Sequence, residues 1–505
     1  MILLDQKYQE LKNRLREIYD LQSVMSMLSW DQNTYLPQAG FKSRSNQLAL
    51  LGKIIHEKET DPALGQLIED LVPWADKLSY DSDEASLIRL VHREYQKAIR
   101  VPPSFISQFH EHIAQTYEAW ARAREENDFT KVAPYVEKSL ELSRTYANYF
   151  PGYEHIADPL INESDYGMKA HQIRQIFGEL RDQLVPLVDQ ITSQSLTDSS
   201  PLLQHYPKEQ QLAFSQYVIK KLGLSPQRSR LDLTIHPFMI RISGDDIRIT
   251  TQVKEDDLSF CLFSVIHEAG HALYELGIHP PYDGTPFYDG TSSGVHESQS
   301  RLWENVIGRS RGFWEHFYPR LQQYFPSQLN HVSLEQFYLA INHVERSPIR
   351  IEADEVTYNL HVIIRFDLEL ALLEGKLEVK DLPEAWRYRY QSDLGITPSC
   401  DLEGVLQDVH WYSGMIGGAF QGYTIGNILS AQFYESALKA HSEIPNQIKQ
   451  GNFETLHNWL VDHIYRYGSK YTAEEIILKA TGSSLTIQPY LYYLRKKFGE
   501  IYSLN

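Results

Sequence analysis

Cysteine is scarce in this sequence, and its scarcity limits the kinds of protein that the chain can be. Only two of the 505 residues are cysteines, Cys261 and Cys400. Two cysteines cannot build the disulfide framework of a small secreted domain, and they suit a reducing compartment. Neither is an obvious metal ligand, because Cys261 falls on the apolar side of the helix predicted around it. We therefore expect a cytoplasmic protein.

Long apolar segments and an excess of basic residues are also missing. No apolar run approaches the roughly 20 residues that a membrane-spanning helix needs, and Met1–Lys7 lacks the pattern of a secretory signal. Lysine and arginine total 48, against 66 aspartates and glutamates, which gives a net charge of -18. A chain this acidic is a poor match for phosphate groups, so we expect no nucleic-acid partner and no membrane partner.

One chemical motif stands out, because residues 267–271 read His-Glu-Ala-Gly-His, an instance of HExxH. On a helix, residues four apart lie one turn apart on the same face. His267 and His271 can therefore bring two imidazole nitrogens to one metal ion. Glu268 lies beside them, close enough to polarise a metal-bound water. The motif predicts a catalytic metal site.

The segment around this motif is predicted to be a helix. Asp256-Asp257 can cap its start and Gly277 can end it. Its apolar stripe consists of Leu258, Leu262, Val265, Ala269, Ala272 and Leu276. A helix with one face in the core and metal ligands on the other suits the lining of a cleft. The alternative is that two helical histidines are ordinary core residues, so the third ligand is decisive.

A zinc site for hydrolysis has three protein ligands and one open position. After a loop over residues 277–294, His296–Asn305 is predicted to be helical, and Glu297 is the first candidate for the third ligand. Glu304 lies two turns further along the same face, so it could support a ligand or be the ligand itself. The weaker candidates are Glu275, Asp283 and Asp289. The alternative for Glu297 is a solvated carboxylate favoured by the helix dipole.

Several other segments accompany the metal motif along the chain. They are Trp30-Asp31 with Pro37, Gly40, Arg44 and Gln47; His236–Phe238; Asp246–Thr250; His296–Gln299; Ile349–Asp354; and Gly404–Trp411. In this order they resemble the carboxypeptidase Taq family of metallocarboxypeptidases. The resemblance covers almost the whole chain, and no departure is evident at the metal or catalytic positions.

The resemblance carries expectations about the cofactor, the assembly and the reaction. It implies one Zn2+ per subunit, for which Co2+ or Mn2+ can substitute, and a homodimer. His410 and Tyr423 are expected to stabilise the oxyanion, because related helical zinc peptidases place a histidine and a tyrosine there. Each could instead be a packing residue, since the chain has 20 histidines and 32 tyrosines.

A peptidase that acts at a C-terminus must recognise a free carboxylate, for which arginine is the natural partner. Arg350 is the first candidate because it lies in a family-like segment, and Arg248 on the predicted hairpin is the second. Either could instead belong to a structural ion pair. His236 and Asp354 are expected to orient metal ligands from behind.

The remaining sequence predicts a mainly α-helical fold, in which a deep active-site groove divides a large helical body. Helical periodicity dominates the chain, including a long helix over Pro348–Leu373. Leu231–Ile242 and Ile247–Val253 flank a turn sequence and predict a β-hairpin or small three-stranded sheet beside the metal helix. Its free edge is expected to hold an extended peptide along the cleft.

No linker interrupts the sequence. We therefore expect residues 1–505 to form a single peptidase domain, with two halves around a central cleft and a metal-site core at about 231–425.

The sequence thus predicts a metal-dependent carboxypeptidase that releases single C-terminal amino acids from short or unfolded peptides. Two alternatives stay open. An oligoendopeptidase or dipeptidyl carboxypeptidase on the same scaffold would also use HExxH and a glutamate. A non-catalytic peptide-binding protein with a structural metal is disfavoured by Glu268, since a structural site needs no base.

Overall fold

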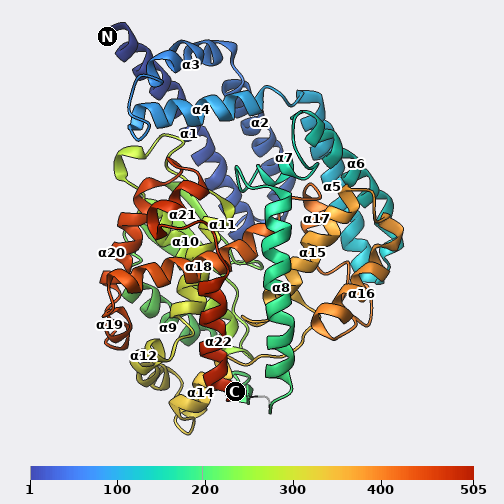
Figure 1. The fold of residues 1–505 in the computed structure, drawn as a ribbon, viewed down its shortest axis with the longest axis vertical. Coiled ribbons are helices and arrows are strands. Elements are labelled where there is room, and N and C mark those ends of the chain that lie inside the picture. The colour runs from blue at the N-terminus through green and yellow to red at the C-terminus, as the bar shows by residue number, and fades with distance from the viewer. Residues whose placement is uncertain (1, 196, 505) are drawn as a thin grey trace.

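The computed structural model describes residues 2–195 and 197–504, and most of them are helical (Figure 1). The N-terminal helices share a small apolar core with a loop that includes Ile278 and Phe287. This core is separate from the main one. The helices are α1 (Ile2–Thr34), α2 (Phe41–Glu59), α3 (Pro62–Ala75) and α4 (Asp83–Ala98).

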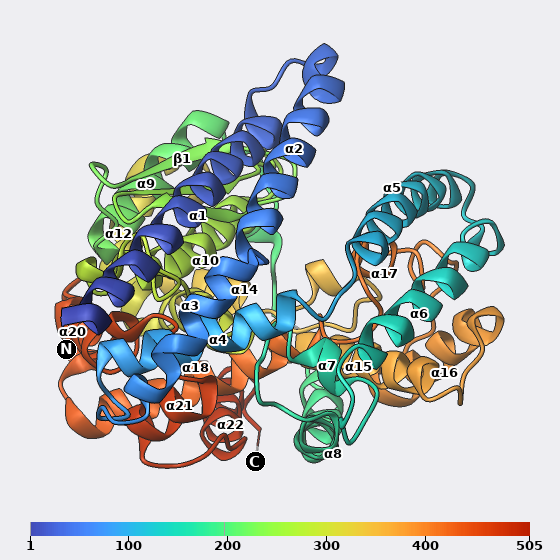
Figure 2. The same ribbon diagram turned by 90° about the horizontal axis from the view of Figure 1, so that it is seen from above.

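A second group of helices lies apart from α1 and α2 in Figure 2. In this group α15 packs against α8 and α16, and α17 packs against α5 and α6. Its members are α5 (Pro103–Glu126), α6 (Ala133–Asn148), α7 (Asp158–Ile161), α8 (Ala170–Thr192), α15 (Tyr358–Leu373), α16 (Leu382–Leu394) and α17 (His410–Ser413).

The other helices surround α10, the helix that carries the HExxH motif. They contribute, with the second group, to one large apolar core. They are α9 (Lys208–Leu222), α10 (Leu258–Leu276), α11 (Ser293–Arg301), α12 (Arg311–Tyr324), α13 (Pro326–Leu329), α14 (Leu334–Ile341), α18 (Gln421–Ala440), α19 (Ile444–Lys449), α20 (Glu454–His463), α21 (Ala473–Thr481) and α22 (Gln488–Tyr502).

A three-stranded sheet packs against α10 through its central strand, β3. The strands are β1 (Ser229–Leu233), β2 (Met239–Ser243) and β3 (Asp246–Thr251). β2 and β3 form the predicted antiparallel hairpin, whereas β1 pairs with β3 in parallel. The single strand predicted over Leu231–Ile242 is therefore wrong. The chain leaves the ladder between β1 and β2 at a segment that contains Pro237, which has no N–H to donate.

The metal helix α10 forms as the sequence indicates. The Asp257 side chain accepts a hydrogen bond from the backbone N–H of Ser259 and caps the N-terminus, and Gly277 follows the last turn. The predicted apolar stripe is buried except for Leu276, which is half-buried. The opposite face carries His267 and His271. The helix is thereby fixed from behind while its histidines stay accessible.

The long helix predicted over Pro348–Leu373 begins ten residues later than expected. Arg350–Glu352 forms a 3-10 turn, and α15 starts at Tyr358. The carboxylate of Asp354 accepts hydrogen bonds from the backbone N–H groups of Val356 and Thr357. This local capping fixes the chain before the helix, and it leaves Arg350 in a turn.

The mainly helical fold with a small sheet beside the metal helix is confirmed. Across residues 2–195 and 197–504, no helix combines the length and apolarity needed to cross a membrane.

Candidate active site

Three side chains from two helices converge on one point. His267 and His271 extend from α10, and Glu297 extends from α11. One ligand atom from each lies within 4.8 Å of the other two. The Glu297 Oε2 atom is 3.7 Å from His267 Nε2 and 3.4 Å from His271 Nε2. This is the arrangement that the sequence predicts for a metal centre.

Two neighbours hold these ligand candidates in place. Glu304 Oε2 accepts a hydrogen bond from His267 Nδ1 at 2.8 Å, so the Nε2 atom of that ring faces Glu297. Arg301 Nε donates to Glu297 Oε1 at 2.7 Å and leaves Oε2 toward the histidines. Burial alone would raise the pKa of Glu297, but Arg301 and His267 hold it well below its usual range. Glu297 is therefore ionised.

The backbone after α11 continues as a π-helical segment, Leu302–Ile307, which contains Glu304. Such segments are frequent at functional sites. The structure thus places Glu304 behind His267, the first of the two positions left open for it.

The donor set fits a divalent transition-metal ion. Burial, followed by the nearby His296, lowers the pKa of His271 to about 3, so its imidazole is neutral as a ligand must be. Burial opposes protonation of His267, but the carboxylates of Glu297 and Glu304 raise its pKa above the usual value, so metal binding would displace a proton from this ring. With both imidazoles neutral, the two histidines and Glu297 form a ligand set that leaves a fourth position open on zinc. Glu268 is buried beside this set, and burial raises the pKa of its carboxyl group to about 7.

Glycine allows the ligand-bearing helices to approach one another closely. A Cβ atom at Gly426 of α18 would lie 2.5 Å from Cγ of Glu297. One at Gly270 of α10 would lie 2.7 Å from the backbone oxygen of Gln299 in α11. Glycines near the cleft therefore set the position of the third ligand candidate.

Gly426→Ala should weaken metal binding because the new methyl group overlaps the Glu297 side chain. Overpacking of this kind costs about 1–3 kcal/mol, and we expect part of it as a raised metal dissociation constant in a chelator competition. Gly178→Ala is the matched control, because nothing lies within 4 Å of that helical position. It should leave metal affinity unchanged, and an equal loss in both variants would contradict this explanation.

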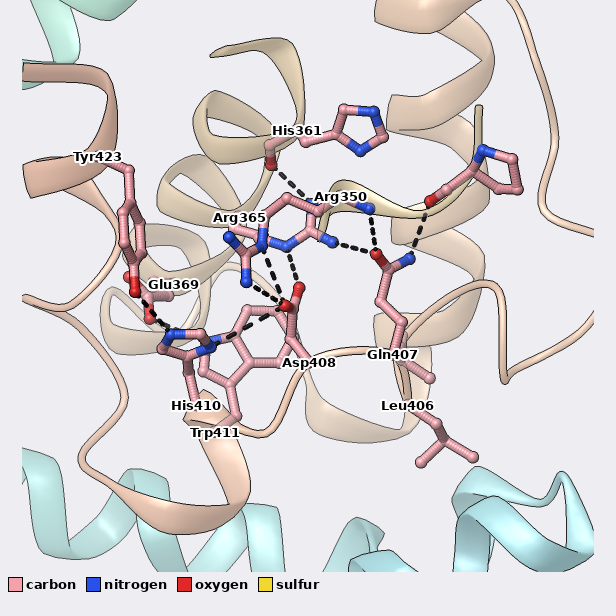
Figure 3. Close-up of polar contacts among 12 residues, drawn as sticks. Arg350, His361, Arg365, Glu369, Leu406, Gln407, Asp408, His410, Trp411 and Tyr423 are labelled. Carbon is pink, nitrogen blue, oxygen red and sulfur yellow. Dashed lines mark hydrogen bonds and ion pairs between the residues drawn. The ribbon is translucent and has the colours of Figure 1, made fainter. Parts of the chain in front are cut away.

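His410 and Tyr423 lie together, as Figure 3 shows. The His410 Nε2 and Tyr423 hydroxyl atoms are 3.0 Å apart. Burial, aided by the charge of Arg350, lowers the pKa of His410 to about 4, so the ring is neutral. Burial also raises the pKa of Tyr423, so its hydroxyl group keeps its proton. The pair can thus donate a hydrogen bond without carrying a charge.

Arg350 lies beside this pair, with its guanidinium carbon 5.3 Å from the centre of the Tyr423 ring. Its Nε and Nη2 atoms donate to Asp408 Oδ1 at 2.9 and 2.7 Å, and its Nη1 donates to the Tyr358 hydroxyl at 2.9 Å. The carboxylate that pairs with Arg350 is therefore Asp408, 58 residues away in sequence. The Tyr358 ring in turn lies 4.5 Å below the guanidinium of Arg301.

Three other predicted site residues lie outside this arrangement. Arg248 pairs with Asp246 and covers the ring of Trp30, so its charge is used within the sheet. Asp354 caps the start of α15. His236 is exposed in the turn between β1 and β2. Within residues 2–195 and 197–504, neither His236 nor Asp354 makes a hydrogen bond to the three ligand candidates, so the geometry gives neither residue a way to orient them.

A cavity of about 850 Å³ opens from the metal centre toward the N-terminal helices. The site contributes His271, His296 and Glu297 to its lining, and the edge strand β2 contributes Met239–Arg241. Helices α1, α3 and α4 form the opposite wall. The free edge of β2 therefore runs along the cavity, where it can pair with an extended chain.

Sequence reasoning missed several residues that support the site. The ring of His296 stacks on that of His271, with the ring centres 4.5 Å apart. His296 Nε2 lies 3.1 Å from Glu275 Oε1, and Arg241 binds the other oxygen of Glu275. Arg301 and Arg365 were not singled out either. Arg365 is buried and Arg301 is half-buried, and each pairs with a carboxylate on another turn or element. Only the i,i+4 spacing of Glu297 and Arg301 was visible in the sequence.

Ligands from HExxH and a downstream glutamate, on a mainly helical scaffold, define a metallopeptidase class. The chain belongs to the carboxypeptidase Taq (M32) metallopeptidase family, which residues 10–498 match. It is therefore a metallocarboxypeptidase, as the sequence predicted.

Its relatives cover nearly the whole chain. It is 38% identical to Thermostable carboxypeptidase 1 of Thermus thermophilus, over 98% of this chain and 99% of that one. It is 35% identical to Carboxypeptidase 1 of Bacillus subtilis, over 98% of each. The crystal structure of the M32 carboxypeptidase from Deinococcus radiodurans R1 is similar with a TM-score of 0.97 and 46% identity, covering 99% of this chain and 100% of that one.

Proposed function

We propose that this metallocarboxypeptidase binds an extended peptide that runs from the 850 Å³ cavity past the metal centre to Arg350. It would remove one C-terminal residue at a time. The observation that carries this proposal is the position of Arg350. It does not line the cavity, and it is linked to Glu297 through Tyr358 and Arg301. A peptide that enters through the cavity would reach Arg350 only after passing the metal centre.

The chain's own residues would perform most of the reaction. A divalent cation held by His267, His271 and Glu297 would supply an activated water and polarise the scissile carbonyl group. Glu268 would accept the proton of that water and deliver it to the leaving amine. His410 and Tyr423 would donate a hydrogen bond to the oxyanion that forms on the substrate.

Arg350 would bind the terminal carboxylate, because arginine pairs with carboxylates through two parallel hydrogen bonds. The test compares kcat/KM for a peptide with a free C-terminus and for its amide. Loss of a hydrogen bond to a charged group is worth about 1.5–3 kcal/mol, so the wild type should prefer the acid by about 10–150-fold. Arg350→Ala should remove most of this preference.

Arg248→Ala is the matched control, since Arg248 is the other candidate and is occupied by Asp246. It should keep the preference for the acid. Equal rates for acid and amide in the wild type would instead favour an endopeptidase. A preference that survives in Arg350→Ala and disappears in Arg248→Ala would move the anchor to Arg248.

We also propose zinc as the working ion, with Co2+ or Mn2+ able to replace it, because imidazole and carboxylate ligands suit all three. A cytoplasmic location is supported by the two cysteines, which are both free.

We further expect a homodimer. Exposed apolar side chains near the tips of α1 and α2, such as Tyr35 and Phe41, could contribute to its interface. Light scattering at micromolar concentration should give twice the chain mass, and a monomer would refute this expectation.

A further inference from the structure

The carboxylate of Asp408 binds two arginines rather than one, as Figure 3 shows. Arg350 donates to its Oδ1 atom through two nitrogens, and Arg365 Nε donates to Oδ2. Arg350, Asp408 and Arg365 are 6%, 8% and 0% exposed. Three charged groups are thus buried together, and two of them are positive. Burying a charge costs free energy of desolvation unless an opposite charge compensates it.

Bonded to one another, these three groups carry a net charge of one positive unit. The nearby histidines do not add to it, because burial lowers the pKa of both His361 and His410. Glu369 accepts a hydrogen bond from Trp411 and contacts neither arginine, and burial raises its pKa to about 7. Below that pH the cluster is therefore positive, because Asp408 is the one carboxylate among residues 2–195 and 197–504 that pairs with either arginine.

Arg350 also keeps unused donors. Its guanidinium has five N–H groups, of which three are bound by Asp408 and Tyr358. Within the described residues, the other two have no hydrogen-bond acceptor. They lie on the group that faces Tyr423, whereas Arg365 is enclosed by Tyr390, Gln407 and the backbone oxygen of His361. Among the same residues Arg365 uses four of its five N–H groups, so Arg350, with two free donors beside Tyr423, is the guanidinium better able to bind a further acceptor.

We propose that Arg365 is a positioning residue for substrate recognition, which neutralises Asp408 so that Arg350 keeps its charge for the terminal carboxylate of the peptide. This inference rests on the proposed role of Arg350. Without Arg365, Arg350 and Asp408 would form a closed neutral pair, and a substrate carboxylate would have to compete with Asp408. Arg365 has no exposed surface, so it cannot contact the peptide.

Arg365 also fixes the turn that carries Arg350. Its Nη2 atom donates to Gln407 Oε1 at 2.8 Å, and the same oxygen accepts the backbone N–H of Arg350 at 2.9 Å. Gln407 Nε2 donates to the backbone oxygen of Pro348 at 3.0 Å. Removal of Arg365 would therefore change both the net charge beside Arg350 and the position of its turn. The variants must separate these two effects.

The test measures the acid-to-amide ratio of kcat/KM at about pH 6, where Glu369 is largely protonated. Arg365→Gln removes the charge and should lower the ratio about tenfold or more, mainly through KM for the acid. The double variant Arg365→Gln/Asp408→Asn restores the net charge and should recover most of the ratio. Arg389→Gln is the matched control, because it removes an ion-paired arginine of α16 outside this cluster, and its ratio should equal that of the wild type.

Three outcomes would overturn the proposal. The first is an unchanged ratio in Arg365→Gln. The second is no recovery in the double variant, which would assign Arg365 a purely structural role. The third is a loss of the ratio in Asp408→Asn, a variant that can be used if Arg365→Gln does not fold. We expect Asp408→Asn to keep or raise the ratio. A loss would mean that Asp408 acts only by orienting Arg350. Equal kcat/KM for the acid and the amide in the wild type would instead refute the proposed function itself.

Discussion

Replacing Glu268 by glutamine should lower kcat by about 10²–10⁴-fold, the contribution typical of a general acid–base group. Glutamine keeps the shape of the side chain but cannot accept a proton from water. The three ligand candidates are untouched, so metal content after dialysis should equal that of the wild type. Steady-state kinetics on one peptide, with metal analysis of the same samples, provides the measurement.

Glu369→Gln is the matched control for this variant. Glu369 is also fully buried with a raised pKa of about 7, but it faces Trp411 instead of the metal centre. If the loss came only from removing a buried carboxyl group, both variants would lose activity equally. Turnover like that of the wild type in Glu268→Gln would eliminate Glu268 as the base.

The parts of the site that follow local rules could be predicted from the sequence. His267 and His271 are four residues apart on a capped helix with an apolar rear face, and this pattern fixes both their positions and their direction. Glu297 was predictable as a carboxylate on the next helix, although α11 begins at Ser293, three residues before the predicted start, so Glu297 lies in its second turn. In each case one helix and its neighbour decide the geometry.

The parts that depend on distant contacts could not be predicted. Arg350 pairs with Asp408 from a different segment, although the acidic residues Glu352 and Asp354 lie much nearer to it in sequence. Asp354 instead caps α15, a use that the sequence does not separate from metal support. Arg365 lies within an apolar helical run and gives no signal of its charge partner. Tertiary packing decided all of these pairings.

Replacing Glu297 should abolish stoichiometric metal binding and activity together, as should His267→Ala or His271→Ala. We expect Glu297→Gln to be the informative form, because it keeps the volume beside Gly426 and a hydrogen-bond acceptor for Arg301. Removal of the charge leaves Arg301 with Glu304 as its remaining carboxylate partner. Loss of one member of a buried pair costs about 3–5 kcal/mol, so thermal unfolding must be recorded to separate metal loss from loss of the fold.

Glu304→Gln distinguishes a ligand from a residue that supports one. Glu304 binds His267 Nδ1, on the far side of the ring from Glu297, so its loss should weaken metal affinity by only about 10–100-fold. Such a variant would still bind metal in excess and regain activity, whereas Glu297→Gln would not. Dissociation constants from chelator competition, measured on both variants, decide between the two carboxylates. If Glu297→Gln kept full metal and Glu304→Gln bound none, the two roles would be exchanged. The third ligand is the carboxylate whose removal abolishes metal binding.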